Sequence, residues 1–321
     1  MKAVVRSEYG SPNVLSIQDI TAPRPNDNEV LVRIYATTVN RTDCGILSGK
    51  PFLIRFFTGL LKPKHHTPGT DFAGRIEAVG KHVDQFKVGD DVWGLDDEGL
   101  SSHAEYMVIE HHKGITHMPT GFSYQQAVAC AEGAHYAFNF INKVTVNRGD
   151  KVLVNGATGA IGSAALQLLK SKGAIVTAVG NTPNLALLES LGADKVVDYL
   201  QEDFLNDADK YHFVFDAVGK SSFSACKKIM EQKAVYISSE LGPHHQNLYL
   251  PLVTKFLGKQ KVIFPIPFNC RRSIEFMTAL AEKGQFKAVI DREYPMDDIK
   301  AAYDYVASGQ KTGNVVINCS T

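Results

Sequence analysis

The stretch from His65 to Gly74 reads HHTPGTDFAG and offers two imidazoles and one carboxylate within seven residues. Zinc takes three protein ligands in fixed geometry at a catalytic site and four at a structural site. Adjacent residues of an extended segment point to opposite faces, so His65 and His66 do not converge on one ion with Asp71. The pattern predicts solvated histidines beside a loop, with no metal bound.

The remaining histidines and cysteines lack metal-ligand spacing too. The run HHKGITH at 111–117 has no i, i+4 pair and predicts a surface segment. No C-x-x-C pair occurs, and an odd number of single cysteines gives no disulfide framework, which favours reduced thiols in the cytoplasm. The five cysteines are Cys44, Cys130, Cys226, Cys270 and Cys319.

The stretch VLVNGATGAIG at 152–162 predicts a cradle for the phosphates of a dinucleotide. Ala157, Gly159 and Gly162 fill the three slots of G-x-G-x-x-G, the first as alanine. Gly159 lets the backbone approach a pyrophosphate, and Gly162 lets the helix pack on the strand. The start of the helix then supplies free N–H groups and the positive end of its dipole.

The residues at the end of the following strand, expected at 174–180, indicate whether the cofactor is NAD or NADP. An NAD enzyme places a carboxylate about twenty residues after the first glycine to bind the ribose 2′-hydroxyl. Here the slot reads GNTPN at 180–184 and holds neither an acid nor a base. Asn181 and Thr182 could donate hydrogen bonds, so the slot favours NADP(H), with a cation from elsewhere needed for the 2′-phosphate.

Two different rhythms along the chain indicate two domains. Up to about residue 120, short alternating strands separated by turns predict a mostly β, barrel-like unit. From 151 onwards, unbroken apolar strands alternate with helices and predict a doubly wound parallel sheet. A helical pattern at 123–141 lies between them, and we assign the last helix and strand, from 271, back to the first domain.

Charge and hydropathy exclude two classes of partner. The chain has 34 basic and 34 acidic residues and no basic stripe, so nothing attracts nucleic acid over long range. The strongest candidate membrane segment, FLIRFFTGLL at 52–61, has ten residues and contains Arg55. That is about half the length needed to span a bilayer, so we expect no membrane partner.

In order along the chain, EVLVRIYATTVNRTD, PGTDFAGRIEAVG, HAEYMVI, KVLVNGATGAIG, LGADKVVDY and GNVVI resemble the medium-chain dehydrogenase/reductase superfamily, in particular its zinc-free quinone oxidoreductase branch. The resemblance covers essentially the whole chain. It implies an α/β protein with a GroES-like β-barrel catalytic domain at 1–121 and 271–321. A Rossmann domain with a doubly wound parallel sheet, binding NADP(H), is expected at 122–270.

The resemblance also locates the zinc ligands of other family members. One histidine ligand corresponds to Thr70, one cysteine to Asn40, and a third ligand falls near Gly133 and Ala134. The four-cysteine lobe of a structural zinc is missing from 94–106, which contains no cysteine. We therefore expect catalysis without a metal.

Without a metal to polarise a carbonyl, conjugated acceptors become the favoured substrates. Quinones and α,β-unsaturated ketones spread the developing charge, so a few hydrogen-bond donors suffice. We expect Asn40 to donate to the substrate oxygen, Asp43 to fix its loop, and His135 to be either a proton donor or a packed core histidine. Gly45 replaces a tyrosine that several quinone reductases carry, which leaves substrate choice open.

The resemblance implies a set of cofactor contacts, mostly at the carboxyl ends of the Rossmann strands, and a homodimer paired along the sixth strand. Two alternatives stay open: a metal-free alcohol or aldehyde reductase, and a nucleotide-binding sensor or scaffold with little turnover. The expected cofactor residues are Ala157, Thr158, Gly159, Ala160, Ile161, Gly162, Asn181, Thr182, Tyr199, Ala217, Val218, Gly219, Ser238, Phe264, Pro265 and Asn314.

Overall fold

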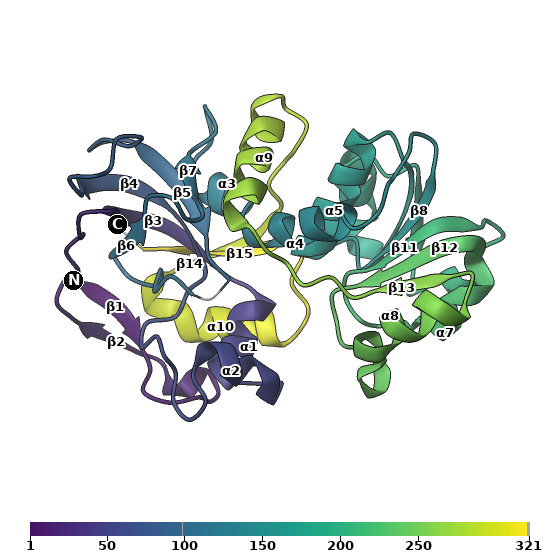
Figure 1. Cartoon of the computed structure of the whole chain (residues 1–321), viewed down its shortest axis with the longest axis horizontal. Helices are drawn as coiled ribbons and strands as arrows, with labels where there is room; N and C mark the ends of the chain where they lie inside the picture. Colours follow the sequence, from purple (N-terminus) through teal and green to yellow (C-terminus); the bar gives the residue numbers. More distant parts are fainter. Residues whose placement is uncertain (98, 320–321) are drawn as a thin grey trace. The chain divides into compact units, whose positions relative to one another are not determined.

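A computed structural model describes residues 1–97 and 99–319, which form two compact units (Figure 1). Unit 1 comprises Met1–Glu132, Asn269–Lys283 and Ala288–Thr321, and unit 2 comprises Gly133–Phe268 and Gly284–Lys287.

The chain leaves the first unit later than the expected boundary at residue 121. Helix α3 (Tyr124–Val128) packs on two strands of unit 1, β3 (Glu29–Val39) and β4 (Asp71–Val79), and so extends that unit. The single helical pattern at 123–141 is divided into α3 and α4 (Glu132–Ile141). The second of these starts at the junction between the units.

A seven-stranded sheet forms the body of unit 1, accompanied by a separate two-stranded ribbon. The remaining strands of this unit are β1 (Lys2–Val5), β2 (Ser16–Asp19), β5 (Asp91–Leu95), β6 (Tyr106–Glu110), β7 (Ile115–His117), β14 (Ile290–Pro295) and β15 (Asn314–Asn318). The sheet runs β14-β15-β3-β4-β5-β7, with β6 also paired to β3, while β1 and β2 form the ribbon. All pairs in this unit are antiparallel except β14 with β15.

Strand β3 shows how the sequence produces both the core and the polar interior of unit 1. Its first half alternates, and Val30, Val32 and Ile34 are fully buried while their neighbours are not. The alternation stops at Thr37 and Thr38, which are buried as well. At this end the strand carries hydroxyl groups into the protein interior.

In the described part of unit 1, five helices lie wholly within the unit, and short 3-10 turns lie at Pro12–Val14, Phe52–Ile54 and Met296–Asp298. Besides α3, the helices are α1 (Arg41–Ser48), α2 (Arg55–Thr58), α9 (Cys270–Glu282) and α10 (Ile299–Ala307). Helix α10 buries Ile299, Ala302, Tyr303 and Val306 against the core, although the sequence had not predicted it.

Unit 2 is a six-stranded, fully parallel sheet in the order β10-β9-β8-β11-β12-β13. The strands are β8 (Lys151–Asn155), β9 (Ile175–Gly180), β10 (Lys195–Asp198), β11 (Tyr211–Asp216), β12 (Met230–Ser238) and β13 (Lys261–Ile263). The helices are α4, α5 (Ala160–Ser171), α6 (Leu185–Ser190), α7 (Phe223–Cys226) and α8 (Gln246–Leu257), with 3-10 turns at Thr182–Asn184, Phe204–Asn206, Lys227–Ile229 and Pro243–His245. The doubly wound sheet expected from the unbroken apolar strands is confirmed.

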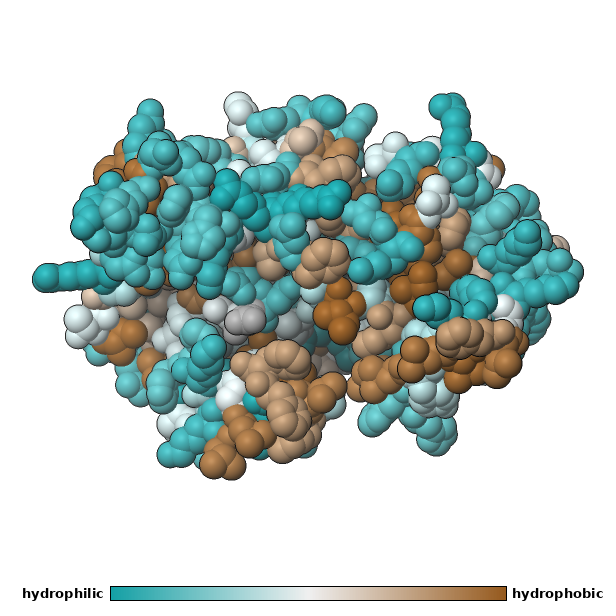
Figure 2. Space-filling view, viewed as in Figure 1, coloured by the Kyte–Doolittle hydropathy of each residue, from teal (hydrophilic) through white to brown (hydrophobic). Residues whose placement is uncertain are grey.

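Exposed large apolar side chains are concentrated on one segment of each unit. In unit 1 they occupy residues 52–61 around α2, and in unit 2 they lie along α8 and appear as brown areas in Figure 2. Among the described residues, no helix has both the length and the hydropathy that crossing a membrane requires.

Candidate active site

The carboxyl ends of the parallel strands in unit 2 form the first part of the site. The strands that follow β8 in the chain lie on both sides of it: β9 pairs with one edge of β8, and β11 pairs with the other. In open α/β sheets, ligands bind where the strand order reverses in this way. The six stretches of unit 2 expected to contact cofactor follow or end β8, β9, β10, β11, β12 and β13, so the fold gathers them at one edge of the sheet.

Three glycines shape the turn between β8 and α5. Gly156 has φ of 76°, and a Cβ there would lie 2.7 Å from Val218 Cβ, so both conformation and space require glycine. At Gly162 a Cβ would lie 2.1 Å from the Gly156 oxygen, which allows the close helix–strand packing predicted from the sequence. At Gly159 the nearest atom would be 3.6 Å away, so a side chain would project into open space at the start of α5. That opening is where a pyrophosphate would approach.

Asp216, at the end of β11, fixes the edge of the sheet at the reversal point. Its Oδ1 accepts a 3.0 Å hydrogen bond from Asn155 Nδ2 and a 2.9 Å bond from the Gly219 backbone N–H. Its Oδ2 accepts from Tyr236 Oη at 2.8 Å. The buried carboxylate thus ties β8 and β12 to the turn that carries Ala217, Val218 and Gly219. Sequence reasoning had noted this turn and missed the role of its aspartate.

A carboxylate from the neighbouring strand β10 lies beside the expected 2′-phosphate slot. Asn181 Oδ1 accepts a 2.7 Å hydrogen bond from Asn184, and the Thr182 hydroxyl donates to Asp198 Oδ2. Asp198 ends β10, the neighbour of β9, and is therefore brought beside the slot by strand pairing alone. Tyr199 follows it with 55% of its surface exposed, which suits a residue at the mouth of a site.

Asn314, the last of the expected cofactor residues, lies in unit 1 on β15. It is buried, and its Nδ2 donates to the backbone oxygens of Ala129 at 2.9 Å and Val289 at 3.1 Å. Its amide nitrogen is therefore engaged in joining three segments of unit 1. A cofactor contact from Asn314 stays a prediction.

In unit 1, Asn40 and Asp43 lie at the start of α1 and belong to a buried polar network. Asp43 Oδ2 accepts a 2.8 Å hydrogen bond from the Asn40 backbone N–H, within a capping box at the start of the helix. Asn40 Nδ2 donates to Thr38 Oγ1 at 2.7 Å, and Thr38 Oγ1 donates to Asp71 Oδ2 at 2.6 Å. Asn40 Oδ1 accepts a 2.9 Å bond from Lys311 Nζ.

Three carboxyl groups share this interior with few positive charges. Burial, reinforced by the Asp71 charge, raises the pKa of Asp43 to about 7. Burial raises the pKa of Asp71 to about 6, against the opposing effect of hydrogen bonds from Thr38 and Thr37. Burial and the Asp43 charge raise the pKa of Glu132 well above its ordinary value. The group prefers to hold protons or to have a cation close by.

Lys311 supplies such a cation. Burial lowers the pKa of its ammonium to about 8, while the Glu132 charge acts in the opposite direction. Sequence reasoning missed Lys311 and Glu132, because 179 residues of chain separate them and each reads as an ordinary surface residue. Nothing in the sequence pattern indicates that their charges act on each other.

Comparison with known proteins agrees with both halves of this architecture. A model described as the alcohol dehydrogenase GroES-like domain matches residues 26–138, and one described as zinc-binding dehydrogenase matches residues 191–317. The chain is 30% identical over 99% of its length to 2-methylene-furan-3-one reductase from Solanum lycopersicum, of which it covers 79%. The chain belongs to the medium-chain dehydrogenase/reductase superfamily. It is an oxidoreductase of the quinone oxidoreductase-like branch of that superfamily.

Two further members show how widely the resemblance extends. NADPH-dependent alkenal/one oxidoreductase from Arabidopsis thaliana is 29% identical over 99% of this chain and 79% of that protein. The structure of the quinone oxidoreductase from Coxiella burnetii superposes with a TM-score of 0.88 at 24% identity, covering 100% of this chain and 99% of the other. That structure supports the two-domain dehydrogenase/reductase fold.

The zinc ligands of other superfamily members are not matched by the side chains at the corresponding positions of unit 1. Asn40 presents an amide whose oxygen is bonded to an ammonium, and Thr70 presents a hydroxyl 3.3 Å from Asp43 Oδ1. Zinc binds cysteine, histidine and carboxylate side chains, and a neighbouring ammonium repels a divalent cation. This pair of positions does not fit a zinc ion.

His135 lies in unit 2 on α4 and is fully buried. Its ring lies edge-on to Tyr136 with centroids 5.8 Å apart, and Nδ1 is 3.3 Å from Asn139 Nδ2. These contacts and its full burial place the ring in the protein interior. A catalytic role for His135 stays a prediction.

The carboxyl edge of unit 2 fits NAD(P)H, the cofactor of this class of oxidoreductase, because the space beside Gly159 faces the first turn of α5. When bound, the nicotinamide supplies a hydride.

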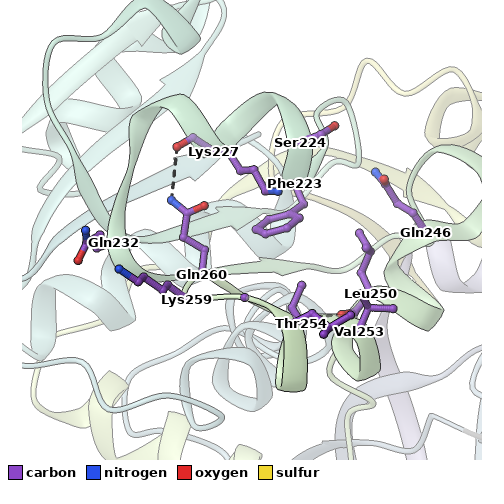
Figure 3. Close-up of a pocket in the computed structure, with 12 residues that line it drawn as sticks. Phe223, Ser224, Lys227, Gln232, Gln246, Leu250, Val253, Thr254, Lys259 and Gln260 are labelled. Carbon is purple, nitrogen blue, oxygen red and sulfur yellow. Dashed lines mark hydrogen bonds between the residues drawn. The ribbon is translucent and has the colours of Figure 1, made fainter.

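A separate cavity of about 480 Å³ lies between α7 and α8, with Phe223 pointing into it (Figure 3). Its other walls include the start of β12 at Gln232 and the turn before β13 at Lys259, so it opens away from the phosphate turn.

Proposed function

We propose that this protein reduces a quinone or an α,β-unsaturated carbonyl with NADPH and without a metal ion. The observation that carries the proposal is the ammonium of Lys311 on the amide oxygen of Asn40, at a position where zinc-dependent relatives bind their metal. A site so arranged offers hydrogen-bond donors and no Lewis acid.

Conjugated acceptors suit such a site for an electronic reason. Uptake of a hydride places negative charge on the substrate oxygen, and conjugation spreads it over an enolate or hydroquinone system before a proton is added. A side-chain N–H aimed at that oxygen stabilises the charge as it develops. Asn40 is our candidate for the donor, and Asp43 holds its loop through the backbone N–H of Asn40 at 2.8 Å.

NADPH is proposed over NADH because residues 180–184 contain no carboxylate. The Arabidopsis relative, an NADPH-dependent alkenal/one oxidoreductase by name, supports the same choice. The carboxylate of Asp198 beside Thr182 is the feature that weighs against it. Asn181, Thr182 and Tyr199 are proposed as contacts on the adenosine side, beside the turn at 157–162.

Assembly, location and domain limits complete the proposal. Strand β13 forms one edge of the sheet in unit 2, and pairing of two such edges would build a homodimer. We propose a cytoplasmic protein on the basis of its single, unpaired cysteines, with unit 1 as the catalytic domain and unit 2 as the cofactor domain.

The proposal is tested by following NADPH oxidation with a panel of quinones, enones, aldehydes and simple alcohols, before and after chelation and with metal analysis of the protein. We expect turnover of the conjugated acceptors that chelation does not change. Turnover confined to simple alcohols or aldehydes and restored by zinc would overturn it.

For the cofactor, NADPH at about 100 times its dissociation constant should stabilise the fold by about 2.7 kcal/mol. A larger thermal shift with NADH at equal concentration would reverse the NADPH assignment.

A further inference from the structure

Lys311 approaches Asn40 from a backbone position that tight packing fixes. It lies between α10 and β15, and its Nζ donates to Asn40 Oδ1 at 2.9 Å and to the Gly313 oxygen at 2.6 Å. Gly313 itself has no room for a side chain, because a Cβ would lie 2.3 Å from the Val289 oxygen. The ammonium is therefore placed against the amide by the fold, and Lys311 as a whole residue is partly buried.

The contacts of Asn40 select one of two possible orientations of its amide. A primary amide has one oxygen acceptor and two N–H donors. The oxygen accepts from Lys311 while the nitrogen donates to Thr38 Oγ1, and the hydroxyl proton of Thr38 is engaged by Asp71. Turning the amide over would place its NH2 group against the ammonium and its oxygen against a hydroxyl that has no proton to give. Both contacts would become repulsive.

This orientation decides what the loop can offer a substrate. One N–H of Asn40 Nδ2 is directed to Thr38, and the trigonal nitrogen points its second N–H elsewhere. In the opposite orientation the loop would present a carbonyl oxygen, which repels developing negative charge. The polarity of the network therefore determines whether Asn40 can act as a donor.

Lys311 also balances the charge of Glu132. The Glu132 carboxyl is buried, one of its oxygens has no hydrogen-bond partner, and Lys311 acts on it electrostatically. A variant that removes the ammonium alone would leave the buried Glu132 carboxyl without the positive charge that acts on it, and would so mix a loss of stability with any effect on Asn40. The ammonium must therefore be removed together with the Glu132 charge.

We propose that Lys311 is a positioning residue for the reduction of conjugated carbonyls. It orients the Asn40 side-chain amide so that an N–H of that amide, and not its oxygen, is directed toward the substrate. Lys311 touches neither substrate nor cofactor in this proposal. The inference rests on the proposed function and deepens it by naming the residue that gives Asn40 its donor role.

A kinetic comparison tests the proposal. The double variant Lys311→Met/Glu132→Gln removes both charges, and the single variant Glu132→Gln is its reference. A second control, Lys300→Met on the exposed face of α10, tests for the effect of losing any lysine. We expect kcat for an enone or quinone to fall about 100-fold in the double variant relative to Glu132→Gln, as when an oxyanion donor is lost, with KM changed less than about threefold. Lys311→Arg should recover at least a tenth of wild-type kcat. In an Asn40→Ala background the double change should cause no further loss.

Unchanged kcat in the double variant, or losses that multiply with Asn40→Ala, would overturn the proposal. Thermal melting of each variant shows whether it is folded before its rates are compared.

A second measurement needs no turnover. The side-chain amide signals of Asn40 are those missing from the ¹H–¹⁵N spectrum of Asn40→Ala. In the wild type we expect two well separated proton shifts and slow exchange with solvent, and in the double variant shifts near those of a free amide. Identical signals in both proteins would overturn the role of Lys311. If wild type reduces no conjugated carbonyl, the proposed function fails while these signals still decide what orients the amide.

Discussion

The side chain of Asn155 donates a 3.0 Å hydrogen bond to Asp216 and so joins the ends of β8 and β11, the two central strands between which the sheet reverses its order. Asp216 also accepts from Tyr236 Oη at 2.8 Å. One buried carboxylate therefore joins the ends of three neighbouring strands, β8, β11 and β12, at the edge of the sheet where NAD(P)H is expected to bind.

Replacing Asp216 with alanine should weaken both folding and cofactor binding, because buried donors from three segments lose their acceptor. We expect the free energy of unfolding to fall by about 3 kcal/mol. Tyr236→Phe removes one of these donors and is the matched control, with an expected loss of about 1 kcal/mol. Urea unfolding measures both changes. Equal effects from the two variants would mean that Asp216 has no special place in the network.

Gly159 and Gly162 should separate binding from folding. A Cβ at Gly159 enters open space, so Gly159→Ala should fold normally yet raise the dissociation constant for NADPH at least about tenfold, by blocking the pyrophosphate. A Cβ at Gly162 would lie 2.1 Å from the Gly156 oxygen, so Gly162→Ala should lose about 3 kcal/mol of stability. Fluorescence titration with NADPH and thermal melting give the two readings. Normal NADPH affinity in Gly159→Ala would place the pyrophosphate elsewhere.

Asp198 should limit the preference for NADPH. Its carboxylate accepts from the Thr182 hydroxyl beside the expected 2′-phosphate position. A neutral Asp198→Asn removes a like charge. Two unit charges about 4 Å apart in water repel by about 1 kcal/mol, so affinity for NADPH should rise about fivefold and affinity for NADH should not change. Parallel titrations with the two cofactors test this. A gain for NADH instead would show that Asp198 faces a different part of the cofactor.

Asp43 should make stability fall as the pH rises. Its pKa is raised by burial from 3.8 to about 7, so the folded state binds this proton more tightly than the unfolded chain. The stabilisation is fully present below pH 3.8 and is lost as the pH rises to about 7. The Asp43→Asn variant has no carboxyl proton to lose at this position. Its free energy of unfolding, compared with that of wild type, should therefore rise by on the order of 3 kcal/mol between pH 4 and pH 8. Melting curves across this range would show a constant difference if Asp43 were ionised throughout.

The phosphate turn and the parallel sheet were predictable because their determinants are local. Glycines at fixed spacing and unbroken apolar runs carry their own backbone and burial preferences, and the structure confirms the doubly wound sheet. Helix α10 was missed because its apolar face is marked by Ile299, Tyr303 and Val306 within one short segment, which reads weakly without knowledge of its partner.

The sequence alone determined the family, the two kinds of domain and the edge of the sheet at which a dinucleotide would bind, since each follows from patterns within one stretch of chain. Tertiary structure alone decided that Lys311 meets Asn40 and that Asp198 lies beside Thr182. Hydrogen bonds and charges act through space over a few ångströms, so their partners are set by strand pairing and packing between segments far apart in the chain. No local pattern encodes them.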